Sequence, residues 1–153
     1  MSINISKLTD PLAGIFPSHT HGVVRLGIDL VHIPGIQESL DRHGDAFERK
    51  LFTPGEVAYA NAAPAHRAER LAARFAAKEA VIKAVGLAED GVGWRELEVV
   101  READGHCSIR LHGRALALAK DRGISGLLLS LSHDGDYAAA VVAALSDKDD
   151  PVG

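Results

Sequence analysis

The segment LAARFAAKEAVIKAVG places three charged side chains where their spacing could serve chemistry, Lys78, Glu79 and Lys83. At about 100° per residue, Lys78 falls inside the apolar stripe of a helix through this segment. That stripe comprises Leu71, Phe75, Ile82 and Val85. A partly buried ammonium group needs an anion, so Lys78 either extends to solvent or meets a phosphate or a carboxylate. Glu79 and Lys83 lie four residues apart on the border of the stripe, where by themselves they form a surface ion pair worth about 0.3–0.5 kcal/mol.

Two further polar side chains stand where strands are expected to end. Asp29 lies between Ile28 and Leu30 in an apolar run, where an unpaired carboxylate is costly. It is therefore either a hydrogen-bonded structural group or a metal ligand. His133 precedes an Asp-Gly turn, so it emerges at a strand end, where a lone histidine is usually structural.

Turn and cap signals predict the elements of the first half of the chain. The β-prone run VVRLGIDLV occupies residues 23–31, and Pro34 then begins a short helix toward Leu40. The sequence TPGE at 53–56 has the form of a capping box with proline at the first helical position, so a second short helix follows to about Asn61.

The longest helix is expected over roughly 65–85, after Pro64, and Gly86 ends it as a left-handed cap. The pattern then changes to strands and hairpin turns. The expected elements are a strand at Leu97 and Val99, a turn at Asp104-Gly105, a strand over 108–112, a helix over 113–122, and two strands over 126–133 and 137–145 joined at Asp134-Gly135. This order predicts an α+β fold with helices packed on a mainly antiparallel sheet.

The composition excludes several classes of protein. A chain of 153 residues with 46% apolar and 25% charged residues fits one globular domain. No apolar run approaches the ~18 residues of a membrane span. The single cysteine, Cys107, excludes a disulfide framework or a cysteine-based zinc site and suits a reducing cytosol, so we expect a cytoplasmic protein. We expect a poorly ordered arm over 1–22, the domain over 23–146 and an acidic tail over 147–153.

Charge is distributed unevenly along the chain. The net charge of −4 gives no reason to expect bulk attraction to nucleic acid or to an anionic membrane. Between Arg42 and Lys83, however, eight basic residues stand against five acidic ones. This local excess is either an ordinary mixed-charge helical surface or a patch for an anionic ligand or an acidic protein.

Taken together, these residues resemble the short 4′-phosphopantetheinyl transferases, the holo-(acyl-carrier-protein) synthase family. The resemblance covers about residues 23–145, and its F-x-x-K-E-x-x-x-K-A motif is specific, whereas the Gly-x-Asp element alone would be weak. The matching segments are GIDLV at 27–31, RFAAKEA at 74–80 followed by Lys83-Ala84 and Gly86, and SLSH at 130–133 with YAAA at 137–140.

The resemblance implies a transferase that moves the 4′-phosphopantetheine arm of coenzyme A onto a serine hydroxyl of an apo acyl carrier protein, which is acidic. The other product would be adenosine 3′,5′-bisphosphate. It further implies dependence on Mg²⁺ and a homotrimer with active sites between subunits. Whether the carrier belongs to a fatty-acid, polyketide or peptide synthase stays open.

For individual residues, the resemblance implies that Asp29 and Glu79 hold Mg²⁺, which prefers one or two protein carboxylates together with phosphates and water. Glu79 would also be the base for the serine hydroxyl, and Lys83 would neutralise or protonate the leaving phosphate. The residues that would bind coenzyme A are Lys78, His133, Gly86 and Arg74.

The chain departs from the family pattern at two places. Where members often carry an Asn-Gly-Lys-Pro-like turn near the adenine, this chain has DGHC at 104–107, so adenine contacts are not carried over. Where many members have a basic residue for the carrier, it has Pro34-Gly35. The remaining candidates for contact with the carrier are Arg42, Arg49, Lys50, Arg67 and Arg70.

Two other functional classes stay open. One is a non-catalytic module that binds the carrier or coenzyme A without turnover, and the presence of Asp29, Glu79 and Lys83 together favours an enzyme over it. The other is a structural α+β trimer whose charged helix is only a solvated face. It predicts no magnesium-dependent rise in melting temperature with coenzyme A.

Overall fold

The computed structural model describes residues 22–147. The arm and the acidic tail expected from the sequence lie outside the described residues, apart from Gly22 and Asp147 at their edges. Within the described range the elements are β1 (Gly22–His32), α2 (Ile33–Leu51), α3 (Pro54–Asn61), the 3-10 turn η2 (Pro64–His66), α4 (Arg67–Val85), the 3-10 turn η3 (Trp94–Glu96), β2 (Leu97–Arg101), β3 (Cys107–Leu111), α5 (Gly113–Asp121), β4 (Gly126–Asp134) and β5 (Tyr137–Ser146).

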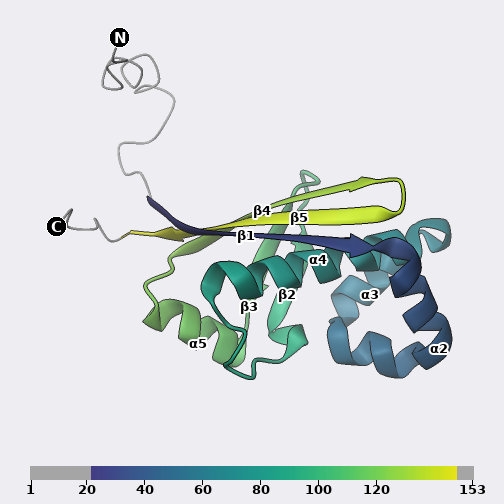
Figure 1. Cartoon of the computed structure of the whole chain (residues 1–153), viewed down its shortest axis with the longest axis horizontal. Coiled ribbons are helices and arrows are strands. Elements are labelled where there is room, and N and C mark those ends of the chain that lie inside the picture. Colours follow the sequence, from purple (N-terminus) through teal and green to yellow (C-terminus); the bar gives the residue numbers. More distant parts are fainter. Residues whose placement is uncertain (1–21, 148–153) are drawn as a thin grey trace, which may run out of the picture.

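The strands form two antiparallel sheets, one with the order β1-β5-β4 and the other a β2-β3 ribbon. Helix α4 packs across β1 and β5, and the ribbon and the shorter helices lie on the same side of the larger sheet as α4 (Figure 1). The predicted α+β class with a mainly antiparallel sheet is confirmed.

Both helix caps that the sequence predicts near the centre of the chain are present. The Thr53 hydroxyl accepts from the Glu56 amide while the Glu56 carboxylate accepts from the Thr53 amide, which is a complete capping box. Gly86 ends α4 with φ 78°, and its amide donates to the Ile82 carbonyl. This left-handed conformation favours glycine because it has no Cβ.

The helix expected from Pro34 toward Leu40 is longer than predicted. It continues to Leu51, with a kink at Gly44, where φ is 53° and ψ is −132°. Glycine adopts this conformation at little cost, so the chain bends there and resumes the helix. Leu40 and Leu51, one on each side of the kink, are both buried against the core.

Small residues allow the larger sheet to approach α4 closely. A Cβ on Gly27 of β1 would lie 2.0 Å from the Ala80 carbonyl oxygen, so the strand backbone rests directly on the helix. Every second residue of β5 from Ala138 to Ser146 faces the same helix and is buried, and most of them are alanine. This contact determines where the polar residues of β1 meet those of α4.

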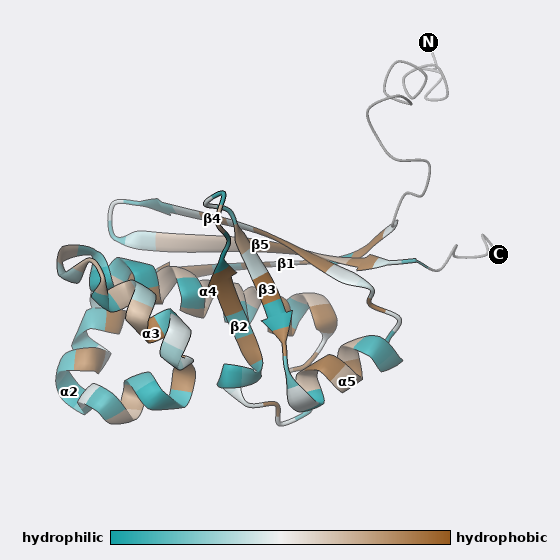
Figure 2. Cartoon of the chain, turned by 180° about the vertical axis from the view of Figure 1, so that it is seen from behind, coloured by the Kyte–Doolittle hydropathy of each residue, from teal (hydrophilic) through white to brown (hydrophobic). Residues whose placement is uncertain are grey.

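The opposite face of the larger sheet is apolar and exposed. Ile28 pairs with Val141 across β1 and β5, and these two side chains are 65% and 41% exposed. Leu26, Leu30 and Leu128 are exposed on the same sheet. Figure 2 shows hydrophobic residues along the strands and mostly hydrophilic ones over α2. No helix of the described part is long and apolar enough to cross a membrane.

Candidate active site

Asp29 and Lys83, which are distant in the sequence, meet where β1 crosses α4. The Lys83 ammonium donates to Asp29 Oδ1 at 3.0 Å and to the Ile28 carbonyl at 2.9 Å. Residues of β1 alternate between the two faces of the sheet, so Asp29 lies on the same face as Gly27 and points toward the helix. Lys83, one helical turn after Glu79 on α4, therefore also forms hydrogen bonds to β1.

Glu79 lies near Asp29 and Lys83, and the pKa of its carboxyl is shifted by burial and by these two charges. Burial and the negative charge of Asp29 raise the pKa of the Glu79 carboxyl above its ordinary 4.5, while Lys83 lowers it. A carboxylate with a raised pKa holds a proton more readily, which suits a general base near neutral pH. The structure thus brings together Asp29, Glu79 and Lys83, the three residues to which the resemblance assigns the chemistry; that they are catalytic stays a prediction.

The donor set at this group fits Mg²⁺ that is shared with a substrate. The two carboxylates lie close enough for the charge of Asp29 to disfavour ionisation of Glu79, and a bound cation would offset that repulsion. Among residues 22–147, no group of three or more His, Cys, Asp or Glu side chains could hold a metal ion. Two carboxylates suffice for Mg²⁺ when phosphate oxygens and water supply its other ligands.

Lys78 is a structural residue, which corrects the expectation that it contacts coenzyme A. Its side chain is 0% exposed and its ammonium donates to Glu56 Oε1 at 2.7 Å and to the carbonyls of Leu97 and Trp94 at 2.6 and 3.1 Å. Of the alternatives that the sequence left open, Lys78 meets a carboxylate. Because all three ammonium donors are used inside the core, none is available to a ligand.

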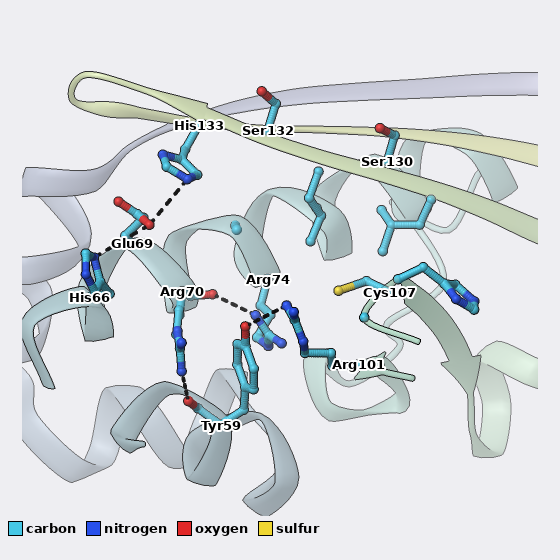
Figure 3. A pocket seen from close by; sticks show the side chains of 15 residues that line it. Tyr59, His66, Glu69, Arg70, Arg74, Arg101, Cys107, Ser130, Ser132 and His133 are labelled. Atoms are coloured by element: carbon cyan, nitrogen blue, oxygen red, sulfur yellow. Dashed lines mark hydrogen bonds and ion pairs between the residues drawn. The ribbon is translucent and has the colours of Figure 1, made fainter. Parts of the chain in front are cut away.

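A cavity of about 650 Å³ opens between α3, the first half of α4, the β2-β3 turn and β4, and arginines line it. The guanidinium groups of Arg70 and Arg74 lie 4.2 and 4.0 Å from the centre of the Tyr59 ring, and that of Arg101 lies 5.6 Å from it. Arg101 also donates to the Tyr59 hydroxyl at 3.0 Å. Figure 3 shows these cations gathered around one ring, which makes the cavity suited to an anionic ligand.

Arg74 lines this cavity, consistent with the expectation that it binds coenzyme A. It is only 3% exposed, and its Nε is a buried polar atom for which the described residues provide no hydrogen-bond partner. Burial lowers the pKa of the guanidinium, and the neighbouring Cys107, Tyr59 and Glu56 oppose that effect. A buried donor without a partner is costly unless a ligand satisfies it.

His133 stands at the other end of the same cavity, on β4. Its Nε2 lies 3.5 Å from Glu69 Oε1, and His66 lies on the other side of Glu69 (Figure 3). The histidine therefore lines the arginine-rich cavity with an exposed imidazole, and its contact with coenzyme A stays a prediction.

Gly86 does not line the arginine-rich cavity. It borders a separate hollow with Arg25 and Arg122, and the Arg122 guanidinium donates to the carbonyls of Val85 and Gly86 at the end of α4. Its observed role is that of a helix cap, so the expectation that it binds coenzyme A has no support in the geometry of the single chain.

Helix α4 separates the carboxylate group from the arginine-rich cavity. Arg70 and Glu79 are nine residues apart, which places them about 180° apart around the helix. None of Asp29, Glu79 and Lys83 lines the cavity. Within one chain, the carboxylate group and the arginine-rich cavity therefore lie on different faces of α4.

Comparison with known proteins identifies the family. The profile of the 4′-phosphopantetheinyl transferase superfamily matches residues 25–142. The chain belongs to this superfamily. This confirms the resemblance seen in the sequence and, with it, the expectation of an enzyme of this family.

Named relatives of this phosphopantetheinyl transferase are similar over most of its length. It is 49% identical over 121 residues to the holo-(acyl-carrier-protein) synthase of Gloeobacter violaceus, which covers 79% of this chain and 92% of that protein. It is 44% identical over 120 residues to the enzyme of the same name from Moorella thermoacetica, with 78% and 91% covered.

Solved structures show the same fold. A complex of ACPS with CoA from Chronobacterium ammoniagenes superposes with a TM-score of 0.70 at 39% identity, covering 80% of this chain and 96% of that one. The Helicobacter pylori holo-(acyl-carrier-protein) synthase in complex with coenzyme A superposes with a TM-score of 0.68 at 25% identity, covering 78% and 98%.

Sequence reasoning missed most of the arginine-rich cavity of this phosphopantetheinyl transferase. Tyr59 and Arg101 come from α3 and β2, and no local pattern links them to α4. Arg70 was expected only as a contact for the carrier, whereas its Nη1 donates to the Tyr59 carbonyl at 2.7 Å. The spacing of Arg70 and Arg74, four residues apart on one helix, was the available signal.

Proposed function

We propose that this member of the superfamily transfers the 4′-phosphopantetheine arm of coenzyme A to a serine hydroxyl of an apo acyl carrier protein and releases adenosine 3′,5′-bisphosphate. The observation that carries the proposal is the meeting of Asp29, Glu79 and Lys83 where β1 crosses α4. We place the reaction in the cytoplasm, because a single free cysteine suits a reducing compartment.

The arginine-rich cavity would bind the nucleotide half of coenzyme A. Its cations match phosphate groups, since a guanidinium presents several donors to phosphate oxygens. The buried Nε of Arg74 would gain a partner there, and His133 would contact phosphate at the far end. The volume of about 650 Å³ falls in the range of sites for single small molecules.

Asp29 and Glu79 would hold Mg²⁺ together with the diphosphate of coenzyme A. When bound, Mg²⁺ supplies positive charge to the diphosphate. Glu79 accepts the proton of the serine hydroxyl, for which its raised pKa is suited. The serine oxygen forms a bond to the phosphorus on the pantetheine side as the bond to the bisphosphate breaks, and the Lys83 ammonium neutralises or protonates the leaving phosphate.

A homotrimer would join the carboxylate group to the arginine-rich cavity. Leu26, Ile28 and Leu30 of β1 are each at least 64% exposed on one face of the sheet, and contiguous apolar surface of this kind is typical of interaction surfaces. The carboxylate group of one subunit would then meet the arginine-rich cavity of the next. The basic residues Arg49 and Lys50 at the end of α2 are candidates for contact with an acidic carrier protein.

The decisive experiment is a mass-shift assay with full-length protein, Mg²⁺, coenzyme A and several apo carrier proteins. We expect the carrier to gain the mass of phosphopantetheine, and Glu79→Gln to abolish the gain while preserving the circular dichroism spectrum. No gain with any carrier would contradict the proposal. If coenzyme A then bound in a calorimeter without product, the chain would instead be a binding module.

A further inference from the structure

The only cysteine of the chain lies in the wall of the arginine-rich cavity. Cys107 is free, partly buried, and the first residue of β3, directly after the turn that closes the β2-β3 ribbon. Figure 3 shows its sulfur pointing toward Arg101 and Arg74. Any reagent bound by these cations is therefore held beside a thiol.

A second observation indicates that this part of the cavity takes a ligand. Arg74 lines the same cavity as the thiol and is only 3% exposed. Its Nη1 donates to the Arg70 carbonyl at 3.3 Å, whereas its buried Nε has no partner among the described side chains. Cys107 and Arg74 both line this cavity, and the sulfur points toward the guanidinium (Figure 3). An anion at this point would satisfy Arg74 and lie next to Cys107.

We propose that Cys107 is a modification site for anionic low-molecular-weight disulfides. Their charged groups bind Arg70, Arg74 and Arg101, and the disulfide then exchanges with the thiol. Cys107 loses its proton to solvent and its sulfur attacks one sulfur of the reagent. A bond forms between Cys107 Sγ and that sulfur, the disulfide bond of the reagent breaks, and the departing thiolate takes a proton from solvent. Cys107 is oxidised, the released thiol is reduced, and a dithiol reverses the step.

Modification of Cys107 would regulate the proposed transfer reaction, and this consequence rests on the proposed function. A mixed disulfide at Cys107 occupies a cavity of about 650 Å³ that is the size of a site for one small ligand. The adduct and the nucleotide half of coenzyme A therefore compete. Oxidation of the thiol pool would switch off transfer by this enzyme, and reduction would restore it.

The chemical part is tested on full-length protein with 5,5′-dithiobis(2-nitrobenzoate), an anionic disulfide, and with cystamine, a cationic one. Each rate is divided by the rate with the same protein unfolded in urea, which removes the intrinsic reactivity of the reagent. We expect the normalised rate to be at least about tenfold higher for the anionic reagent, and to fall toward that of cystamine at high salt. Equal normalised rates would overturn the proposal.

A matched pair of variants locates the effect. Arg101→Gln removes a cation of the cavity. Arg110→Gln removes another exposed cation from β3, the strand that Cys107 begins, and Arg110 does not line the cavity. We expect only Arg101→Gln to lower the anionic preference several-fold. Adenosine 3′,5′-bisphosphate, which has no thiol of its own, should protect Cys107 in the parent chain. An identical effect of both variants, or no protection, would overturn the assignment.

The functional part compares transfer before and after treatment with glutathione disulfide, with adduct formation measured by mass spectrometry. We expect transfer to fall in proportion to the adduct, to return with dithiothreitol, and to keep its untreated value in Cys107→Ser. Full labelling with unchanged transfer would overturn the proposed switch. If the untreated protein transfers nothing, the proposed function fails, while the charge preference and its variants still decide whether Cys107 is a modification site.

Discussion

Replacing Gly27 by alanine tests how closely the backbone of β1 packs on α4 beside Asp29 and Lys83. The new Cβ would lie 2.0 Å from the Ala80 carbonyl oxygen and 2.9 Å from the Ala84 nitrogen, whereas real Cβ contacts essentially never fall below 3.0 Å. Both neighbours are helix backbone and cannot rotate away. The strand must therefore move outward by about 1 Å or more, and a shift of this kind in a packed core costs about 1–3 kcal/mol.

The assay is urea unfolding of Gly27→Ala beside Gly22→Ala, on the same strand, at one protein concentration. A Cβ on Gly22 meets nothing within 4 Å, so that control isolates the change in the unfolded chain, which stabilises by at most about 1 kcal/mol. With a slope of about 2 kcal/mol per molar urea, we expect the midpoint of Gly27→Ala to fall by roughly 0.5–1.5 M. Equal midpoints for the two variants would refute the reasoning.

Two further predictions concern α4. Lys78→Met leaves the buried Glu56 carboxylate without its ammonium partner and should lower the free energy of unfolding by about 3–5 kcal/mol. Lys83→Met, at an exposed ion pair, should change the free energy of unfolding by about 1 kcal/mol or less. Similar losses for the two variants in urea unfolding would contradict this prediction. The raised pKa of Glu79 means that the folded state binds the proton of this carboxyl more tightly than the unfolded state does. The free energy of unfolding therefore falls as pH rises above the ordinary pKa of 4.5, where the unfolded state loses this proton first. Glu79→Gln should therefore be more stable than the parent at pH 7 and equal to it near pH 4, and a melting-temperature difference that does not change with pH would contradict the assignment.

Local patterns were sufficient for most elements and for one half of the site. The capping box at Thr53, the left-handed cap at Gly86 and the two hairpin turns depend on residues adjacent in the chain, so they could be predicted without knowledge of the packing. Asp29 could be singled out because a carboxylate at an apolar position is costly wherever the chain folds. Glu79 could be singled out only by its place in the family motif and its four-residue spacing from Lys83. The extent of α2 was underestimated because the kink at Gly44 resembles a helix end in the sequence.

Partnerships between distant residues were decided only by the tertiary structure. Lys78 was recognised as an ammonium in need of an anion, but whether that anion was a ligand or Glu56 depended on how α3 packs against α4. Tyr59 and Arg101 have no signal of their own, since each becomes part of an anionic-ligand cavity only when α3 and β2 converge on Arg74. Sequence determines which groups are costly to bury, because that cost belongs to the residue type. Which partner offsets the cost is a matter of three-dimensional distance, and only the folded chain sets it.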